Sequence, residues 1–242
     1  MPEDTPKLAV SIIVPAYNEA ENLPILVGEI EQALSAVEDG FEIVIIDDGS
    51  TDATAEIIAD MQAHRSFVRG VFFDGNYGQS SAFDAGIRRA RGRAVVLIDA
   101  DLQNDPADIP RLVDALGEYD AAVGWRADRR DPWTKRLTSR FANFTRRLAT
   151  GDRTHDTGCS LKAFRREILR RVKLFHGMHR FLATLVEMEG ASVVEVKVNH
   201  RPRRFGRSKY SIFNRSLGPT LDLLAVMWMR RRRLRYRLRE RG

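Results

Sequence analysis

Short apolar runs alternate with amphipathic stretches along the first half of the chain. The apolar runs are rich in Val and Ile and are followed by Pro or Asp, which predicts strands buried on both faces of a sheet. The alternation predicts a mainly parallel sheet with helices on both faces. The expected strands are 8–14, 41–46, 68–73 and 95–98, and the expected helices are about 20–37, 53–63 and a third after Ser80.

The second half of the chain is less regular. Residues 123–126 predict the end of a fifth strand, and an arginine-rich stretch without clear periodicity follows them. A helix is expected from His179 to about Met188, and a further strand over 193–198.

Polar clusters follow the first, second and fourth expected strands. After the fourth, Asp99, Asp101 and Gln103 alternate with apolar residues, and in an extended backbone such residues share one side. Oxygen ligands of this kind suit Mg²⁺ or Mn²⁺, and open α/β sheets bind ligands at the carboxyl ends of their strands. The alternative is an Asp-rich turn in which Asp105-Pro106 begins the next helix.

Composition indicates one α/β domain with a full core, because the chain has 242 residues, 43% of them hydrophobic. A single cysteine, Cys159, excludes an internal disulfide and fits a reducing cytoplasm. No secretory signal is apparent in residues 1–7.

The net charge of +6 comes from residues 230–242, which hold eight arginines and one glutamate; the remainder has 31 basic and 32 acidic residues. The basicity is therefore a local, C-terminal feature.

Glycine spacing argues against two common nucleotide-binding classes. No G-x-G-x-x-G follows the first strand and no Walker sequence is present. The motifs instead resemble those of the family-2 glycosyltransferases, and more narrowly the dolichyl-phosphate-mannose synthase branch with its bacterial polyprenyl-phosphate relatives. The matching segments, within residues 8–215, are 14–19 (VPAYNE), 47–52 (DDGSTD), 99–103 (DADLQ), 156–160 (DTGCS) and 203–210 (RRFGRSKY).

This resemblance implies a GT-A-type nucleotide-sugar-binding fold over residues 6–215. Asp48 would read the base together with Ile46, since a carboxylate can accept from a ring N–H, although an ordinary turn and helix cap is the alternative for 47–52. Arg203 and Lys209, in the 203–210 loop, would reach the donor phosphates. The alternative is that this segment is only a basic surface loop. The full set implied to bind the nucleotide sugar is Pro15, Tyr17, Glu19, Ile46, Asp48, Asp99, Ala100, Asp101, Arg203 and Lys209.

The same resemblance implies that Asp99, Asp101 and Gln103 hold the divalent ion on the donor diphosphate, with Asp101 counted as catalytic. A metal ion stabilises the leaving nucleoside diphosphate. Asp99 and Asp101 are too close in sequence to divide acid and base roles as in a glycosidase, which favours chelation.

Arg126, also implied to be catalytic, would bind the acceptor phosphate with Lys135 and Ser139, because guanidinium, ammonium and hydroxyl groups bind phosphate oxygens. Lys135 departs from the arginine usual in the family. A polyprenyl phosphate is mostly a dianion at neutral pH, so it needs no general base, and inversion at the anomeric carbon is expected. The alternative is that these residues belong to a solvent-exposed basic surface without a binding role.

The C-terminal residues 216–242 predict a segment that associates with a membrane. Residues 217–229 are apolar, but thirteen residues interrupted by Asp222 are too short to span a bilayer, which takes about 20. With the arginines of 230–241 they predict an interfacial anchor on an anionic cytoplasmic leaflet. Nucleic-acid binding or a membrane-protein partner are the alternatives for these arginines.

Together these features predict an inverting, metal-dependent enzyme, peripheral on the cytoplasmic face of the membrane. It would move a sugar from GDP-mannose or a UDP-sugar onto a polyprenyl phosphate. A second hypothesis keeps the fold but uses a glycan or protein hydroxyl as acceptor. A third, from another class, is a non-catalytic basic protein that binds membranes or nucleic acid.

Overall fold

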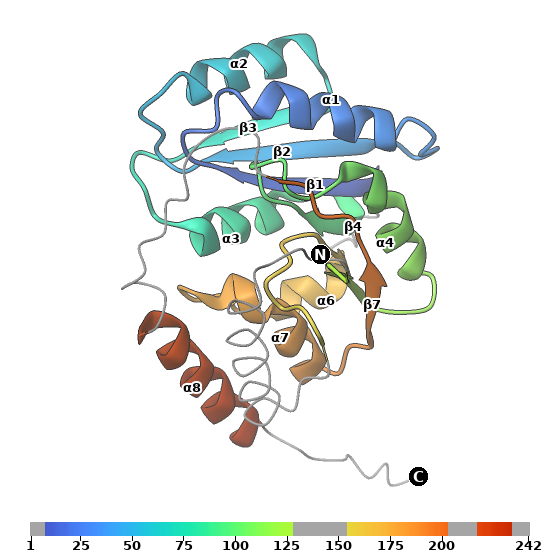
Figure 1. The fold of residues 1–242 in the computed structure, drawn as a ribbon, viewed down its shortest axis with the longest axis vertical. Coiled ribbons are helices and arrows are strands. Elements are labelled where there is room, and N and C mark those ends of the chain that lie inside the picture. The colour runs from blue at the N-terminus through green and yellow to red at the C-terminus, as the bar shows by residue number, and fades with distance from the viewer. Residues whose placement is uncertain (1–7, 128–153, 203–216, 234–242) are drawn as a thin grey trace, which may run out of the picture.

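The computed structural model describes residues 8–127, 154–202 and 217–233, in which the strands form one seven-stranded sheet in the order β3-β2-β1-β4-β6-β5-β7 (Figure 1). Its strands are β1 (Leu8–Ala16), β2 (Phe41–Asp47), β3 (Val68–Phe72), β4 (Gly92–Leu97), β5 (Ala121–Trp125), β6 (Lys162–Arg165) and β7 (Val193–Lys197). The helices are α1 (Leu23–Ala33), α2 (Thr54–His64), α3 (Gln79–Arg89), η1 (Pro106–Asp108), α4 (Ile109–Ala115), α6 (Arg166–Arg171), η2 (Met178–Phe181), α7 (Leu182–Met188) and α8 (Leu217–Arg231).

The half of the sheet formed by β3, β2, β1 and β4 is parallel throughout, as the alternation predicts. The elements lie where they are expected, with shifted ends. Helix α1 is shorter than predicted, and a proline stands in its first turn, where a missing N–H costs nothing. Strand β4 begins at Gly92, three residues before the predicted start.

The other half is mixed. Strand β6, which the sequence pattern does not predict, lies antiparallel between β4 and β5, whereas β7 pairs parallel with β5. The sheet is therefore mainly parallel, and the predicted α/β class is confirmed. Strands β5 and β7, and the helix over η2 and α7, are also confirmed. A four-residue strand after a long irregular stretch has too little periodicity to be recognised.

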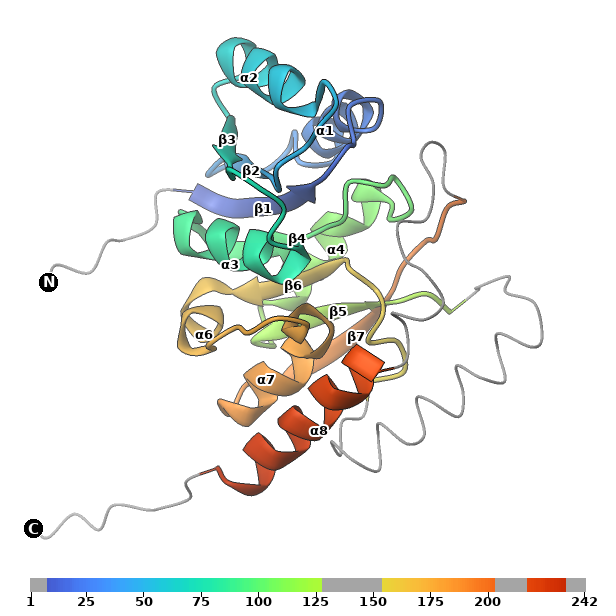
Figure 2. The same cartoon turned by 90° about the vertical axis from the view of Figure 1, so that its left-hand side faces the viewer.

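Helices cover both faces of the sheet (Figure 2). Each face carries its own hydrophobic core. On β1, Val10, Ile12 and Val14 point toward α1, α2 and α4, while Ile13 points toward α3. Gly86 allows α3 to approach closely, because a Cβ there would lie 2.3 Å from Ile13 Cγ2. These two cores make the central strands rigid, which fixes the positions of the loops at their ends.

Helix α8 lies at the outside of the molecule beside α7 (Figure 1). Its Val226 joins a small apolar cluster with Met178 and Phe181 of η2 and Leu185 of α7. The helix covers the predicted apolar segment 217–229 and extends to Arg231. None of the helices in the described residues is both long and apolar enough to span a bilayer.

Candidate functional site

The three N-terminal motifs meet at one edge of the sheet. In the strand register Ala16 lies opposite Asp47, and Ile13 lies opposite Leu97. Since β2, β1 and β4 are neighbours, the loops after their carboxyl ends are neighbours too. This is the place where open α/β sheets bind ligands.

The loops after β1 and β2 are joined by short hydrogen bonds. Asn18 has a left-handed backbone (φ 53°), its N–H donates to Ser50 Oγ at 2.9 Å, and its Oδ1 accepts from the Thr51 N–H at 2.8 Å. The Glu19 N–H donates to Thr54 Oγ1 at 2.9 Å. Asn tolerates the left-handed region better than most residues, so the motif residue suits the turn.

Of the residues predicted to form the nucleotide pocket, Pro15, Tyr17 and Glu19 are half-buried along this edge. The side chain of Ile46 is fully buried in the core beneath α3. Any contact between Ile46 and a base must therefore come from its backbone.

Asp48 is 4% exposed, and both of its carboxylate oxygens accept backbone N–H groups, from Tyr77 at 2.7 Å and Gly78 at 2.9 Å. Burial raises the pKa of Asp48, and the two N–H donors act against that rise. Gly49 stands beside it with φ 70°, and a Cβ there would lie 2.4 Å from the backbone of Gly75. Asp48 therefore anchors the loop that leads into α3, and its remaining lone pairs are what a base could use.

Strand β4 ends at Leu97, and Leu102 is left-handed (φ 59°), so the extended alternation assumed for residues 99–103 is wrong. Residues 100–102 form a turn instead. Asp99 Oδ1 accepts from Gln79 Nε2 at 2.6 Å, and Asp101 Oδ1 accepts the Gln103 N–H at 3.1 Å.

Burial and the neighbouring charge of Asp101 raise the pKa of Asp99 to about 6, while the Ser160 hydroxyl and the charges of Lys162 and Arg126 act to lower it. A divalent cation bound beside Asp99 and Asp101 would offset the repulsion that Asp101 exerts on the ionised Asp99. In the described residues no three His, Cys, Asp or Glu side chains gather at one point, so an ion here would depend on Asp99, Asp101, the Gln103 amide and substrate oxygens.

Arg126, at the end of β5, is held by Asp156 through two hydrogen bonds, Nε to Oδ2 at 2.7 Å and Nη2 to Oδ1 at 2.9 Å. The pair is largely buried, with side chains 11% and 13% exposed. Burial acts to lower the pKa of Arg126, but the bond to Asp156 outweighs it, so the pKa is raised. A phosphate at this position would share the guanidinium with Asp156.

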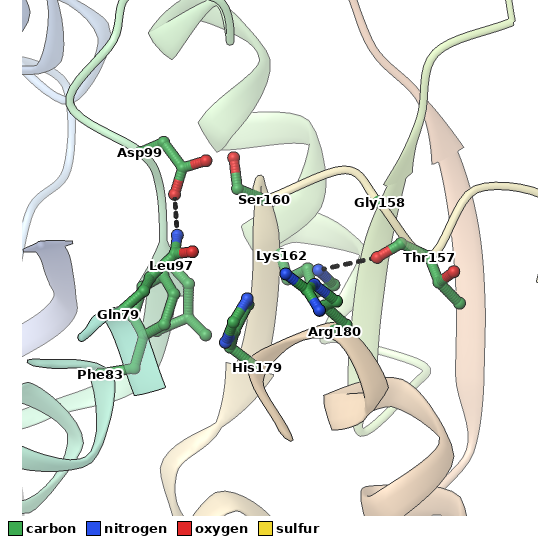
Figure 3. A pocket seen from close by; sticks show the side chains of 10 residues that line it. All are labelled: Gln79, Phe83, Leu97, Asp99, Thr157, Gly158, Ser160, Lys162, His179 and Arg180. Atoms are coloured by element: carbon green, nitrogen blue, oxygen red, sulfur yellow. Dashed lines mark hydrogen bonds between the residues drawn. The ribbon is translucent and has the colours of Figure 1, made fainter. Parts of the chain in front are cut away.

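A cavity of about 200 Å³ lies beside Asp99, between β4, α3, β6 and η2 (Figure 3). Asp99 and Gln79 occupy one end, and Lys162, His179 and Arg180 project from β6 and η2 (Figure 3). The Lys162 ammonium donates to the Cys159 carbonyl and, at 3.5 Å, to the Thr157 carbonyl. The full lining is Gln79, Phe83, Leu97, Asp99, Thr157, Gly158, Ser160, Lys162, His179 and Arg180.

Four predicted residues, Lys135, Ser139, Arg203 and Lys209, lie outside the described residues. Conversely, the structure places Lys162, His179 and Arg180 in the lining of the cavity, and the sequence pattern did not identify them as site residues. The one available signal was Lys162 itself, a charge inside the apolar run Leu161–Phe164. Arg180 and His179 carry no local signal because they reach the cavity only through the packing of η2.

The chain matches the family model for glycosyl transferase family 2 over residues 11–173. It is 39% identical over 234 residues to a dodecaprenyl-phosphate galacturonate synthase from Rhizobium johnstonii, which covers 94% of this chain and 69% of that protein. It is 37% identical over 220 residues to an undecaprenyl-phosphate 4-deoxy-4-formamido-L-arabinose transferase from Pectobacterium carotovorum, covering 90% of this chain and 67% of the relative.

Solved structures show the same fold. A glucosyl-3-phosphoglycerate synthase from Mycobacterium tuberculosis, in complex with Mn²⁺, UDP and its product, superposes with a TM-score of 0.67 at 18% identity, over 92% of this chain and 80% of that one. A mannosyltransferase from Pyrobaculum calidifontis, in complex with GDP-mannose and Mn²⁺, superposes with a TM-score of 0.58 at 23% identity, over 82% and 58%. With its fold, its ordered motifs and these sequence matches, the chain belongs to glycosyl transferase family 2 and is a glycosyltransferase.

Proposed function

We propose that this glycosyltransferase moves a sugar from a nucleoside-diphosphate sugar, GDP- or UDP-linked, onto a polyprenyl phosphate, with Mg²⁺ or Mn²⁺ as cofactor. The observation that carries the proposal is the meeting of three motif loops at the ends of β1, β2 and β4, with the Asp99–Asp101 pair beside a cavity. The two sequence relatives are named for polyprenyl-phosphate acceptors, and they differ in the sugar they transfer.

In this proposal Pro15, Tyr17 and Glu19 line the nucleotide site with Asp48, and Asp99, Asp101 and Gln103 hold the metal ion. When bound, the ion supplies positive charge that stabilises the departing diphosphate. The Gln103 N–H, just after the turn at Leu102, donates to the Asp101 carboxylate at 3.1 Å, and Gln79 fixes the Asp99 carboxylate through its 2.6 Å hydrogen bond. Arg203 and Lys209 would add charge near the donor phosphates.

The reaction is a single displacement. An acceptor phosphate oxygen forms a bond to the anomeric carbon, and the bond from that carbon to the diphosphate oxygen breaks, its electron pair leaving with the nucleoside diphosphate. Arg126, Lys135 and Ser139 would bind the acceptor phosphate, which then lies on the face of the sugar opposite the leaving group. The product therefore has inverted configuration.

A hydroxyl acceptor, on a glycan or protein, would require a general base. His179, which lines the cavity, is unsuited to that role, because burial and then the charge of Arg180 lower its pKa to about 3, and its Nδ1 is already paired with Ser80 Oγ at 2.8 Å. This favours the phosphate acceptor, which ionises by itself.

We also propose that α8 seats the enzyme on an anionic membrane surface at the cytoplasmic face. Leu221, Leu224 and Trp228 recur at helical spacing and are 64%, 54% and 64% exposed, while Val226 faces the protein. The four arginines of 230–233 are exposed at the end of the helix. An apolar stripe followed by basic side chains is typical of interfacial helices.

A thermal-shift panel tests the enzymatic proposal. GDP-mannose, UDP-glucose, UDP-N-acetylhexosamines and UDP-hexuronates are each added with and without Mn²⁺; a donor at 100 times its Kd stabilises the protein by about 2.7 kcal/mol. We expect a metal-dependent shift with one nucleotide. The absence of any shift would instead support a non-catalytic role.

Vesicle sedimentation tests the membrane proposal. Deleting residues 230–242, or replacing Leu224 and Trp228 by Ser, should weaken binding to anionic vesicles. Phe72→Ser, at an aromatic residue 48% exposed on β3, is the matched control and should bind as the parent does. Equal binding by all variants would remove the membrane role of α8.

A further inference from the structure

The cavity beside Asp99 has a strongly polarised lining. Asp99 is the only acidic side chain among its lining residues, and Lys162 and Arg180 are basic side chains on the opposite wall. Burial lowers the pKa of Lys162, and the nearby charges of Asp99 and Asp156 act against that fall and favour the charged ammonium. Both cations act on His179 electrostatically, so they lie close together on the wall formed by β6 and η2 (Figure 3). The cavity thus has an acidic end and a cationic wall.

Neither cation of this wall forms a hydrogen bond or ion pair with a carboxylate of the described residues, although the charges of Asp99 and Asp156 act on Lys162. Lys162 is 4% exposed and bonds only to backbone carbonyls, which carry no full charge. Arg180 is half-buried and forms no hydrogen bond or ion pair with the described residues. Buried charges are normally in direct contact with a counter-charge, because removing an ion from water is costly. The buried Lys162, with the half-buried Arg180 on the same wall, therefore indicates an anion supplied by a ligand.

The position and size of the cavity indicate which part of a ligand it takes. If Asp99 and Asp101 hold the ion on the donor diphosphate, as in the proposed function, the sugar bonded to that diphosphate must lie next to Asp99. The volume of about 200 Å³ is below the roughly 300 Å³ at which drug-sized pockets begin, and it is large enough for one sugar ring. Phe83 and Leu97 supply an apolar floor for such a ring.

We propose that this cavity is the donor-sugar subsite and that Lys162 and Arg180 select an acidic sugar, a nucleoside-diphosphate hexuronate, by binding its carboxylate. This inference rests on the proposed function. A neutral hexose at the same place would leave the two cations without a carboxylate in direct contact. The guanidinium of Arg180 matches a carboxylate with two parallel hydrogen bonds, and Lys162 adds a point charge.

Calorimetry on the full chain with Mn²⁺ tests the proposal. Binding of UDP and GDP is measured first, and the nucleotide that binds is then compared in matched pairs that differ only at C6: UDP-glucose with UDP-glucuronate and UDP-galactose with UDP-galacturonate, or GDP-mannose with GDP-mannuronate. We expect at least one hexuronate to bind about tenfold tighter than its neutral partner, in line with a charged hydrogen bond.

Arg180→Gln should remove about tenfold of the hexuronate affinity while leaving the neutral sugar within about twofold. Lys162→Met is a second variant, but its buried bonds to the 157–159 loop also affect folding, so Arg180→Gln decides. Arg170→Gln, an exposed arginine on α6, is the matched control and should change neither affinity.

Three outcomes would overturn the inference. Neutral sugars that bind as tightly as both hexuronates would exclude acid selection while leaving the proposed function intact. An Arg180→Gln variant with a raised KM for polyprenyl phosphate and unchanged donor affinity would assign the cation wall to the acceptor phosphate instead. Failure of both UDP and GDP to bind would remove the proposed function together with this inference.

Discussion

The two halves of the sheet build their polar groups in different ways. In the parallel half, the polar side chains follow directly after β1, β2 and β4, and they bond to loops next to them, as Asn18 does with Ser50 and Thr51. In the mixed half, the charged groups Arg126, Lys162 and Arg180 come from β5, β6 and η2, far apart in the sequence.

This difference is physical. A parallel strand–helix–strand unit places every loop that follows a strand at the same edge of the sheet, so a motif at the carboxyl end of a strand is positioned by local structure. An inserted antiparallel strand such as β6 reverses that order, so a side chain at its beginning, Lys162, joins the same site from the opposite direction. The parallel half of the sheet therefore carries its polar groups in short contiguous motifs. The mixed half carries charged groups that only the packing of distant segments brings together.

The largest effect, a loss of activity, is expected from a substitution in the motif loops of the parallel half of the sheet. Asp101→Ala should reduce metal-dependent transfer by about 1,000-fold, because it removes a carboxylate that stabilises charge on the leaving group. Its melting temperature should stay close to the parent value. Sugar transfer to polyprenyl phosphate with Mn²⁺ is the measurement, and Asp114→Asn, an exposed acid on α4, is the control. Unchanged turnover in Asp101→Ala would rule out the metal assignment.

The next prediction concerns the ion pair between Arg126 and Asp156 in the mixed half of the sheet. Asp156→Ala should lower the free energy of unfolding by about 3 kcal/mol, because it leaves the largely buried guanidinium of Arg126 without its partner. The control is Asp39→Ala, which breaks the exposed ion pair of Arg93 and Asp39, whose side chains are 53% and 56% exposed. It should change the free energy of unfolding by less than about 1 kcal/mol. Urea denaturation measures both; equal losses would mean that the Arg126 pair is not specially important to the fold.

Packing under the motif loops gives a smaller effect. Gly86→Ala should destabilise the protein by about 2 to 3 kcal/mol, since the new methyl group would lie 2.3 Å from Ile13 Cγ2 and 2.9 Å from Ile46 Cδ1. Gly28→Ala on α1 is the control, because nothing lies within 4 Å of a Cβ there. A stable Gly86→Ala variant would show that α3 can move away from β1 and β2 without cost.

The smallest effect concerns pH. The folded pKa of His179, about 3, lies below the ordinary 6.5 of the unfolded chain, so its neutral form is favoured by folding. Its contribution is complete above pH 6.5 and falls as the pH drops toward 3, by roughly 2 kcal/mol at pH 5. His179→Gln should lose less stability than the parent between pH 7 and 5, measured by urea denaturation at each pH. His64→Gln, an exposed histidine, is the control; identical pH dependence in all three proteins would contradict the burial of a neutral His179.

The sequence by itself determined the parallel half and its loops. Apolar runs ending in Asp47-Asp48 and Asp99-Ala100-Asp101 predict both the strands and the edge at which they end, because strand burial and chain connectivity are local properties. The same pattern failed at β6, whose four residues carry too weak a period, and at residues 99–103, where a left-handed Leu102 replaces the expected extended backbone.

Only the tertiary structure decided which distant residues share the cavity. Nothing near Arg180 in the sequence indicates that η2 brings it to the same cavity as Lys162, since that depends on how η2 and α7 pack against the sheet and α8. Nor does the DDGSTD motif reveal that Asp48 is enclosed by the N–H groups of Tyr77 and Gly78. Motifs in neighbouring loops follow from connectivity, whereas a cavity wall follows from the packing of elements that connectivity leaves far apart.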